Sequence, residues 1–131
     1  GLPPQDGPLA QGYFVQPTVF ADVKPEMTIS REEIFGPVLA AIEFADLDEA
    51  IAKANDTPYG LAAGVWTRDI KKAHYVARKL QAGTVWINTY NVYDTAAPFG
   101  GYKQSGFGRE MSMHALEHYT QVKSVWVDLN Q

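Results

Sequence analysis

The sequence of 131 residues contains no cysteine. The chain therefore has no disulfide, no thiolate ligand for zinc or an iron–sulfur cluster, and no cysteine nucleophile of its own. It also lacks a long apolar run, since the run from Pro37 to Ile42 is far below the roughly 18 residues that a transmembrane helix needs. With no visible signal peptide, we expect a cytoplasmic location and no membrane partner.

Positive charge is also scarce, because 11 Lys and Arg residues face 15 Asp and Glu, for a formal charge of −4. A nucleic-acid binder needs a basic face, so we expect no nucleic-acid partner. Hydrophobic residues make up 46% of the chain, which is a usual globular share. The chain starts at Gly1 rather than Met, which suggests a cleaved or truncated N-terminus. Residues 1–12 are rich in Pro and Gly and are predicted to be a loop or linker remnant.

Strand-like and helix-like segments alternate from Tyr13 onward, which predicts an α/β sheet with crossover helices. Strands are expected at 13–20 (an edge or bulged strand because of Pro17), 37–44, 62–67 and 84–88. The first helix follows an Asp46-x-x-Glu49 capping box, and its apolar stripe is Leu47, Ala50, Ile51 and Ala54.

A second helix is expected between the last two of these strands. Either Thr67 or Asp69 can cap its start, and Gly83 is expected to end it. Its predicted buried stripe consists of apolar residues at helical spacing: Ile70, Ala73, Ala77 and Leu80.

The last third of the chain is less regular. Residues 89–109 form a long connection rich in glycine and aromatic residues, which is typical of a functional loop. A short helix is expected over 110–119 and a terminal strand over 120–129. That strand has apolar residues on both faces and would be sticky at an exposed edge, so we expect it to pair with another sheet, in this chain or in a partner.

Two motifs invite readings that their spacing does not favour. In the loop Gly100–Gly108, Phe107 stands at the position of the P-loop lysine, and Met111 replaces the third glycine of a dinucleotide-binding turn. A turn-rich active-site or packing loop is therefore favoured. His114 and His118 lie in an H-x-x-E-H string that could hold zinc. Only Asp128 supplies a carboxylate side chain after His118, so a zinc hydrolase is kept as the less favoured alternative.

The segment from Glu32 to Pro37 (EEIFGP) places two adjacent carboxylates beside an aromatic ring and a rigid turn. Adjacent carboxylates can raise one pKa for acid–base work, or can simply be solvated. A carboxylate beside a ring also suits a ribose, because the acid accepts hydrogen bonds from two hydroxyls while the ring packs on the sugar or base.

Read together, four segments closely resemble the NAD(P)-dependent aldehyde dehydrogenase superfamily. They are GYFVQPTVF from Gly12, EEIFGPV from Glu32, QAGTVWIN from Gln81 and PFGGYKQSG from Pro98. The resemblance runs from about Gly12 to Leu129 and matches the C-terminal portion of that family. It implies an open α/β fold: the second half of the catalytic domain over 13–119, followed by an oligomerisation strand over 120–131.

The resemblance also implies roles for individual residues. Glu33 matches the carboxylate that holds the nicotinamide ribose of NAD or NADP, and Phe35 the aromatic ring beside it. Thr89, Asn91, Tyr93 and Phe99 match positions that line the aldehyde tunnel. No residue of this chain matches a catalytic or metal-binding residue, because the family's nucleophilic cysteine, general base and oxyanion-hole asparagine lie upstream of the matching region.

The implied activity is oxidation of an aldehyde to a carboxylic acid by the complete enzyme, a homo-oligomer (dimer or tetramer). The isolated chain is expected to be inactive. The alternative from another class is a non-catalytic dimerising or regulatory fragment that keeps this part of the fold.

Overall fold

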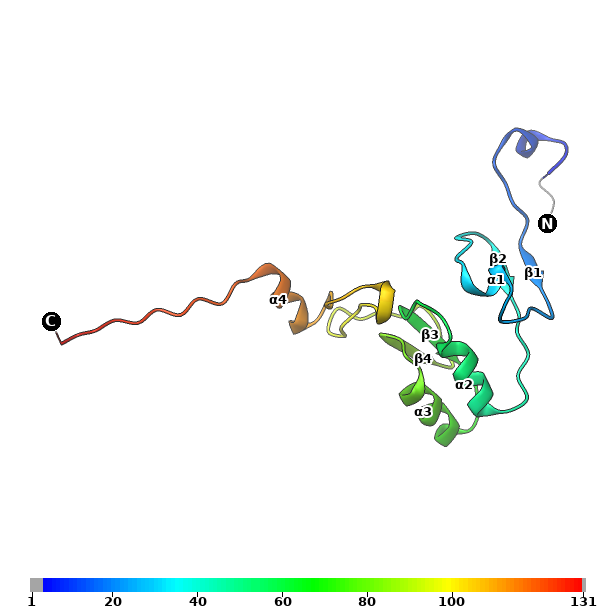
Figure 1. The fold of residues 1–131 in the computed structure, drawn as a ribbon. Coiled ribbons are helices and arrows are strands. Elements are labelled where there is room, and N and C mark those ends of the chain that lie inside the picture. Colours follow the sequence, from blue (N-terminus) through cyan, green and yellow to red (C-terminus); the bar gives the residue numbers. More distant parts are fainter. Residues whose placement is uncertain (1–3, 131) are drawn as a thin grey trace. The chain divides into compact units, whose positions relative to one another are not determined.

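The computed structural model describes residues 4–130, and residues 1–3 and 131 of the expected linker and terminal strand lie outside this range. The chain divides into two compact units, residues 1–57 and 58–131, which are described separately below. The helices and strands alternate as α/β units (Figure 1), as the sequence predicts. Among the described residues no helix is long and apolar enough to cross a membrane. The cytoplasmic location stays a prediction.

The first unit is built on two short parallel strands, β1 (Thr18–Phe20) and β2 (Val38–Ala40), which pair from Thr18↔Val38 to Phe20↔Ala40. The short helix α1 (Thr28–Arg31) lies on the connection between them. β1 starts directly after Pro17, which has no N–H to donate to the ladder. Within the described part of the N-terminal segment predicted as a loop or linker, residues 4–12, there is an exposed 3₁₀ turn, η1 (Pro8–Gln11).

The helix α2 (Leu47–Asn55) confirms the capping box. The Asp46 side chain accepts a hydrogen bond from Glu49 N (2.9 Å), and the Glu49 carboxylate accepts one from Ala45 N (2.6 Å). Lys53 lies 2.8 Å from the same carboxylate. The Ala45 N–H bond and then Lys53 lower the pKa of Glu49 below its ordinary value of 4.5, because both stabilise the ionised form.

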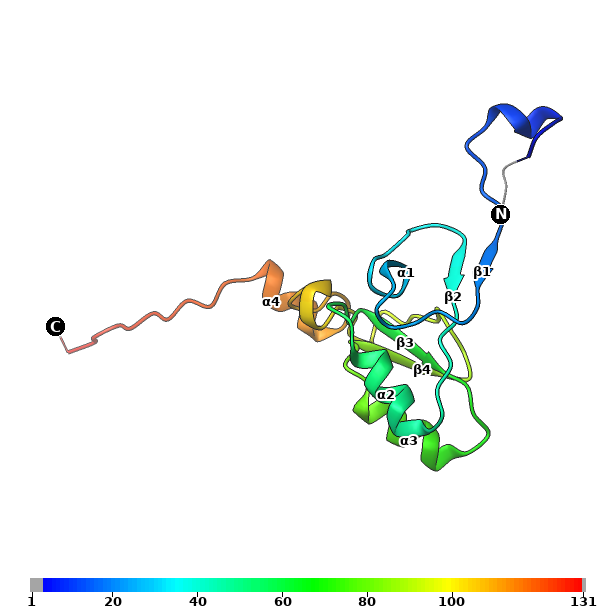
Figure 2. The same cartoon turned by 45° about the vertical axis from the view of Figure 1, so that its right-hand side comes forward.

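In the second unit, β3 (Ala62–Val65) and β4 (Thr84–Ile87) form a parallel pair in the register Ala62↔Thr84 to Val65↔Ile87. The helix α3 (Ile70–Lys79) connects them and packs against both strands (Figure 2). The Asp69 carboxylate caps α3 by accepting from the backbone N–H groups of Lys71 and Lys72, at 2.9 and 3.1 Å. Asp69, rather than Thr67, is therefore the cap.

Two features of α3 correct the sequence predictions. The buried residues of α3 are Ala73 and Val76, whereas Ile70 is 64% exposed. The helix ends at Lys79, because Leu80 already has extended backbone, so Gly83 does not end it. Among the described residues, β1–β2 and β3–β4 form two two-stranded parallel sheets, one in each unit.

The C-terminal part departs furthest from the prediction. Instead of one helix over 110–119, the structure has a 3₁₀ turn, η3 (Met113–Ala115), and one turn of helix, α4 (Leu116–Tyr119). Met111 and Ser112 have φ values of 61° and 51°, which a right-handed helix does not allow, so helical backbone starts only after Ser112. Residues 120–130 are extended and exposed, and no described strand pairs with them.

Candidate functional site

The first candidate residues lie on the loop between α1 and β2. Glu32 N donates to Thr28 O at the end of α1, and Val38 N donates to Gly36 O across the turn that leads into β2. Within this short loop Glu33 is exposed and Phe35 is 92% exposed. Phe35 has φ 53°, which is costly for a bulky side chain. The loop therefore presents a carboxylate and a free aromatic face two residues apart.

The second group lies at the carboxyl end of β4, where parallel sheets commonly bind their ligands. Asn88, the first residue after β4, has φ 54°. Its Oδ1 accepts from Thr67 N (2.8 Å) and its Nδ2 donates to Thr67 O (2.9 Å). These two hydrogen bonds join the segments that follow β3 and β4, and they fix the point at which the loop leaves the sheet. Thr89 follows at once and is exposed.

An aromatic cluster covers this loop. Trp86 is 8% exposed and its ring lies edge-on to Tyr90 (4.9 Å between centroids) and Tyr93 (5.5 Å). Tyr93 in turn lies edge-on to Phe99, at 5.3 Å. Trp66 lies 6.4 Å from Tyr90 at the periphery. Such edge-to-face contacts are a favourable arrangement for aromatic rings, so the cluster holds the loop in one shape.

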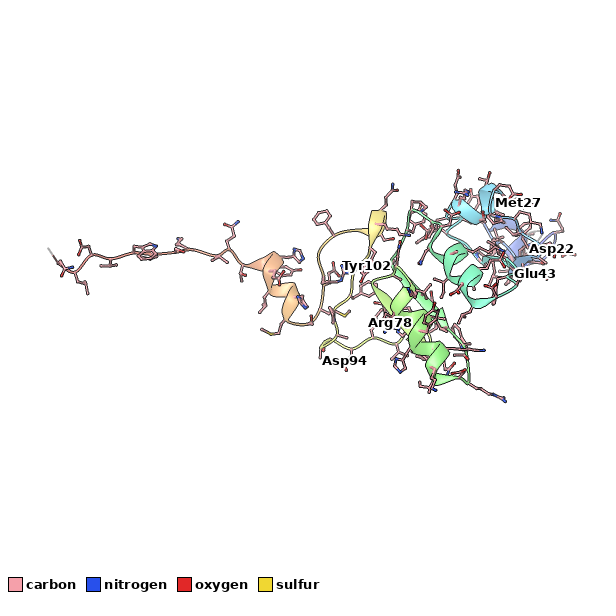
Figure 3. All side chains as sticks on the ribbon, turned by 60° about the horizontal axis from the view of Figure 1, so that its bottom comes forward. Asp22, Met27, Glu43, Arg78, Asp94 and Tyr102 are labelled. Carbon is pink, nitrogen blue, oxygen red and sulfur yellow. The ribbon has the colours of Figure 1, made fainter. Side chains whose placement is uncertain are left out.

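Asn91 belongs to the same group. It has φ 62°, and its Oδ1 accepts a hydrogen bond from the Tyr93 hydroxyl at 2.8 Å. Asp94 (labelled in Figure 3) begins the next turn, where its carboxylate accepts from Ala96 N at 2.8 Å. The Tyr93 ring thus contacts the rings of Trp86 and Phe99, and its hydroxyl is bonded to Asn91, while 48% of the residue stays exposed.

The glycine loop, residues 100–108, follows Phe99 of the aromatic cluster in the chain. Phe99 and Glu110 exchange two backbone hydrogen bonds of 2.7 and 2.8 Å, so the segment returns to its own start. Arg109 donates from Nη1 to the carbonyl oxygens of Gly101 (3.1 Å) and Gly108 (2.7 Å). Its guanidinium lies 5.4 Å from the ring centroid of Tyr102. Arg109 therefore stabilises the loop through backbone contacts.

Two glycines explain why this loop packs so closely. A Cβ on Gly83 would overlap the carbonyl oxygen of Gly100, and a Cβ on Gly108 would overlap the His118 ring. Gly108 also has φ 75°, which favours glycine. The close packing agrees with the prediction of a turn-rich loop. A concavity of about 340 Å³ is lined by this loop, Phe99, His118 and Tyr119.

His114 and His118, the two histidines of the H-x-x-E-H string, both contact other groups of the protein. His114 Nδ1 lies 3.5 Å from a Glu117 carboxylate oxygen, and His118 Nε2 accepts from Arg109 N at 3.2 Å. Within residues 4–130 no three His, Asp or Glu side chains gather in a way that could hold a metal ion. The zinc alternative therefore gains no support from the geometry.

The structure thus brings Asn91, Tyr93 and Phe99 together, with Thr89 at the start of the same loop. Glu33 and Phe35 belong to the other unit, where both are exposed on the loop between α1 and β2. The site predicted from the sequence did not include Trp86 and Tyr90, which belong to the aromatic cluster. Their spacing from Tyr93 (aromatic residues at 86, 90 and 93, straddling the end of a strand) is the signal that could have identified them.

Comparison with known proteins gives a consistent result. Residues 2–125 match the model of the aldehyde dehydrogenase family. A betaine aldehyde dehydrogenase of Brucella anthropi is 55% identical over 131 residues, which are 100% of this chain and 27% of that protein. The chain therefore spans about a quarter of the length of this relative.

Solved structures also resemble the chain. An aldehyde dehydrogenase from Bacillus cereus in complex with NAD+ matches with a TM-score of 0.86 and 62% identity, over 92% of this chain and 24% of that one. A mutant of the P. syringae indole-3-acetaldehyde dehydrogenase AldA, in complex with NAD+ and IAA, matches with a TM-score of 0.83 and 56% identity, over 88% and 23%.

Proposed function

Because this chain belongs to the aldehyde dehydrogenase family, we propose that it is the C-terminal portion of an enzyme that oxidises an aldehyde to a carboxylic acid with NAD or NADP. The observation that carries the proposal is the match over residues 2–125, combined with an exposed aromatic wall on the loop after β4. In this proposal the chain contributes a cofactor contact, a substrate wall and a contact between subunits.

The loop from Glu32 to Pro37 has the chemistry for a nicotinamide ribose. The exposed Glu33 carboxylate offers two oxygens that can accept from adjacent hydroxyls, and the exposed Phe35 ring offers a face for the sugar or base. The cofactor, when bound, supplies the hydride acceptor. Glu33 and Phe35 orient it, and orientation within the bound complex contributes strongly to the rate of a transfer step.

Tyr93 and Phe99 are proposed to line the aldehyde tunnel, with Asn91 and Thr89 at the base of the same loop. The aromatic faces favour an apolar aldehyde of modest size, and they can also receive a cationic one. The chain has no cysteine, so a thiolate nucleophile must come from outside these residues. We therefore expect the isolated chain to be inactive.

The test is an assay of NADH formation from NAD, or NADPH formation from NADP, with a panel of aldehydes. The full-length protein should oxidise at least one aldehyde, whereas the isolated chain should give no turnover above background. Turnover by the isolated chain would contradict the proposed division of roles. Absence of turnover by the full-length protein on every aldehyde would contradict the function itself.

One observation favours a second candidate, a dimerising fragment without catalysis. Val122, Trp126 and Leu129 are 102%, 94% and 87% exposed on the extended C-terminal segment, and such an apolar edge is suited to pairing with another chain. Sedimentation of the isolated chain tests this candidate, because a stable dimer that persists at low concentration supports it and a monomer removes it.

A further inference from the structure

Trp86 is the largest residue among the buried apolar side chains of residues 4–130. It lies on β4, directly behind the loop proposed to line the aldehyde tunnel. Its indole Nε1 donates a hydrogen bond of 2.8 Å to the carbonyl oxygen of Val92. Val92 itself is 62% exposed, so this bond ties an outer part of the loop to a buried strand residue.

The ring of Trp86 also organises the side chains on either side of that bond. Tyr90 and Tyr93 flank Val92 in the sequence, and both rings meet the indole edge-on, at interplanar angles of 61° and 88°. Phe99 is reached only through Tyr93, at 82°. The buried Trp86 side chain thus holds the backbone of the loop at Val92 and sets the orientation of the Tyr90 and Tyr93 rings.

We propose that Trp86 is a positioning residue that determines which aldehydes the tunnel accepts. This inference rests on the proposed function, because it assumes that Tyr93 and Phe99 face the substrate. Trp86 is buried, so it acts through the tyrosines and the Val92 carbonyl. Loss of the N–H donor leaves that carbonyl without its protein partner and frees the loop to shift, which changes the width of the tunnel.

The experiment uses the full-length enzyme and two probe aldehydes, acetaldehyde and benzaldehyde. Trp86→Phe keeps an aromatic ring and removes the N–H donor. A narrow wall distinguishes aldehydes mainly by fit, so the ratio of kcat/KM for benzaldehyde to that for acetaldehyde should change by about tenfold. The change should come from the KM for benzaldehyde, while kcat for acetaldehyde stays within about twofold, because Trp86 does not touch the reacting atoms.

Trp66→Phe is the matched control. Trp66 is 64% exposed and contacts Tyr90 only at the periphery, so the same substitution there should leave the ratio unchanged. If Trp86→Phe does not fold, benzothienylalanine placed at position 86 alone decides the question, since sulfur replaces the N–H in a ring of the same shape.

The outcomes separate this inference from the proposed function. A changed ratio in a folded position-86 variant, with an unchanged ratio in Trp66→Phe, supports the role of Trp86. An active wild-type enzyme whose ratio is the same with tryptophan, phenylalanine or benzothienylalanine at position 86 overturns it and leaves the function standing. A wild-type enzyme that oxidises no aldehyde with either NAD or NADP overturns the proposed function first.

Discussion

Asn88 combines an unusual backbone with a two-point side-chain contact. Its φ of 54° lies in the left-handed region, where asparagine is tolerated better than most residues, and its amide bonds both backbone groups of Thr67. These two properties hold the start of the loop after β4 against Thr67, which follows β3. Substitution separates the two contributions. Glycine tolerates the positive φ but makes no side-chain hydrogen bonds, whereas alanine neither tolerates this φ well nor makes the hydrogen bonds.

We therefore predict that Asn88→Ala lowers the free energy of unfolding of the unit by about 1–3 kcal/mol, through two lost hydrogen bonds and a strained φ. Asn88→Gly should cost less, because it loses only the hydrogen bonds. Denaturant unfolding of the full-length protein, followed by tryptophan fluorescence, measures both. Equal losses for the two variants would contradict the contribution of backbone strain.

Glu33 allows a similarly local prediction for catalysis. Glu33→Gln keeps the size of the side chain but removes the carboxylate charge that strengthens hydrogen bonds from the two ribose hydroxyls. The cofactor should therefore be held less well in the position for hydride transfer. We expect hydride transfer in a single turnover of the full-length enzyme to slow by about tenfold. The neighbouring Glu32→Gln is the control. An unchanged single-turnover rate for Glu33→Gln would count against the role.

Residue-scale predictions from the sequence had uneven support in the geometry. Tyr93 and Phe99 lie in ring contact, as neighbours on a tunnel wall require, and Asn91 is tied to Tyr93. The role of Trp86 could not be read from composition, because its hydrogen bond to Val92 depends on a positive φ at Asn88 and at Asn91 that reverses the chain. The roles themselves stay predictions until the variants are measured.

At the scale of elements, the capped start of α2 is a self-contained unit. Asp46 accepts from Glu49 N, and Glu49 accepts from Ala45 N and pairs with Lys53. We predict that Asp46→Ala destabilises α2 by about 1 kcal/mol, the usual value of an N-cap. Hydrogen exchange of the amides of α2 in the full-length protein should become about fivefold faster. Asp48→Ala, in the first turn but not at the cap, is the control.

The lowered pKa of Glu49 gives this element a pH dependence. A carboxyl whose folded pKa lies below its ordinary 4.5 stabilises the folded form above that value and loses its contribution as pH falls through the folded pKa. Glu49→Gln should therefore speed exchange in α2 at neutral pH, and the difference from wild type should disappear in acid. A difference that persists well below the folded pKa would show that the charge is not responsible.

Elements defined by local chemistry were predictable, and elements defined by distant partners were not. The caps at Asp46 and Asp69 depend on neighbours within three residues, so the sequence alone indicates Asp46 and narrows the second cap to Thr67 or Asp69. The burial of Val76 rather than Ile70 depends on which face of α3 meets β3 and β4. The predicted helix over 110–119 failed because two successive residues, Met111 and Ser112, reverse the backbone, which no propensity indicates.

At the scale of the whole molecule, the C-terminal segment has no strand partner among the described residues. Residues 120–130 are extended, and their apolar residues alternate in the pattern of a strand, yet no described strand pairs with them. A strand needs a partner for its backbone N–H and C=O groups, which a single chain's sequence does not identify. This is why the pattern predicts a strand while the structure of the chain alone shows only its extended backbone.

We propose that in the full-length protein this segment pairs with another subunit. Deletion of Val122 to Leu129 should then shift the homo-oligomer toward monomer, because it removes both the ladder and the apolar faces of Val125, Val127 and Trp126. Light scattering over a range of protein concentrations measures the shift. An intact oligomer after the deletion would contradict the role of the segment.

A point variant separates pairing from gross damage to the fold. Trp126→Lys places a charge on a residue that is 94% exposed in the chain alone, so a segment without a partner should tolerate it. If the segment is covered by a second subunit, the same charge would be buried there and should weaken assembly by at least tenfold in Kd. Lys123→Gln, which keeps the apolar faces, should assemble as the wild type does. Equal assembly of Trp126→Lys and Lys123→Gln would mean that the Trp126 face stays in solvent, and the subunit contact would then have to lie elsewhere.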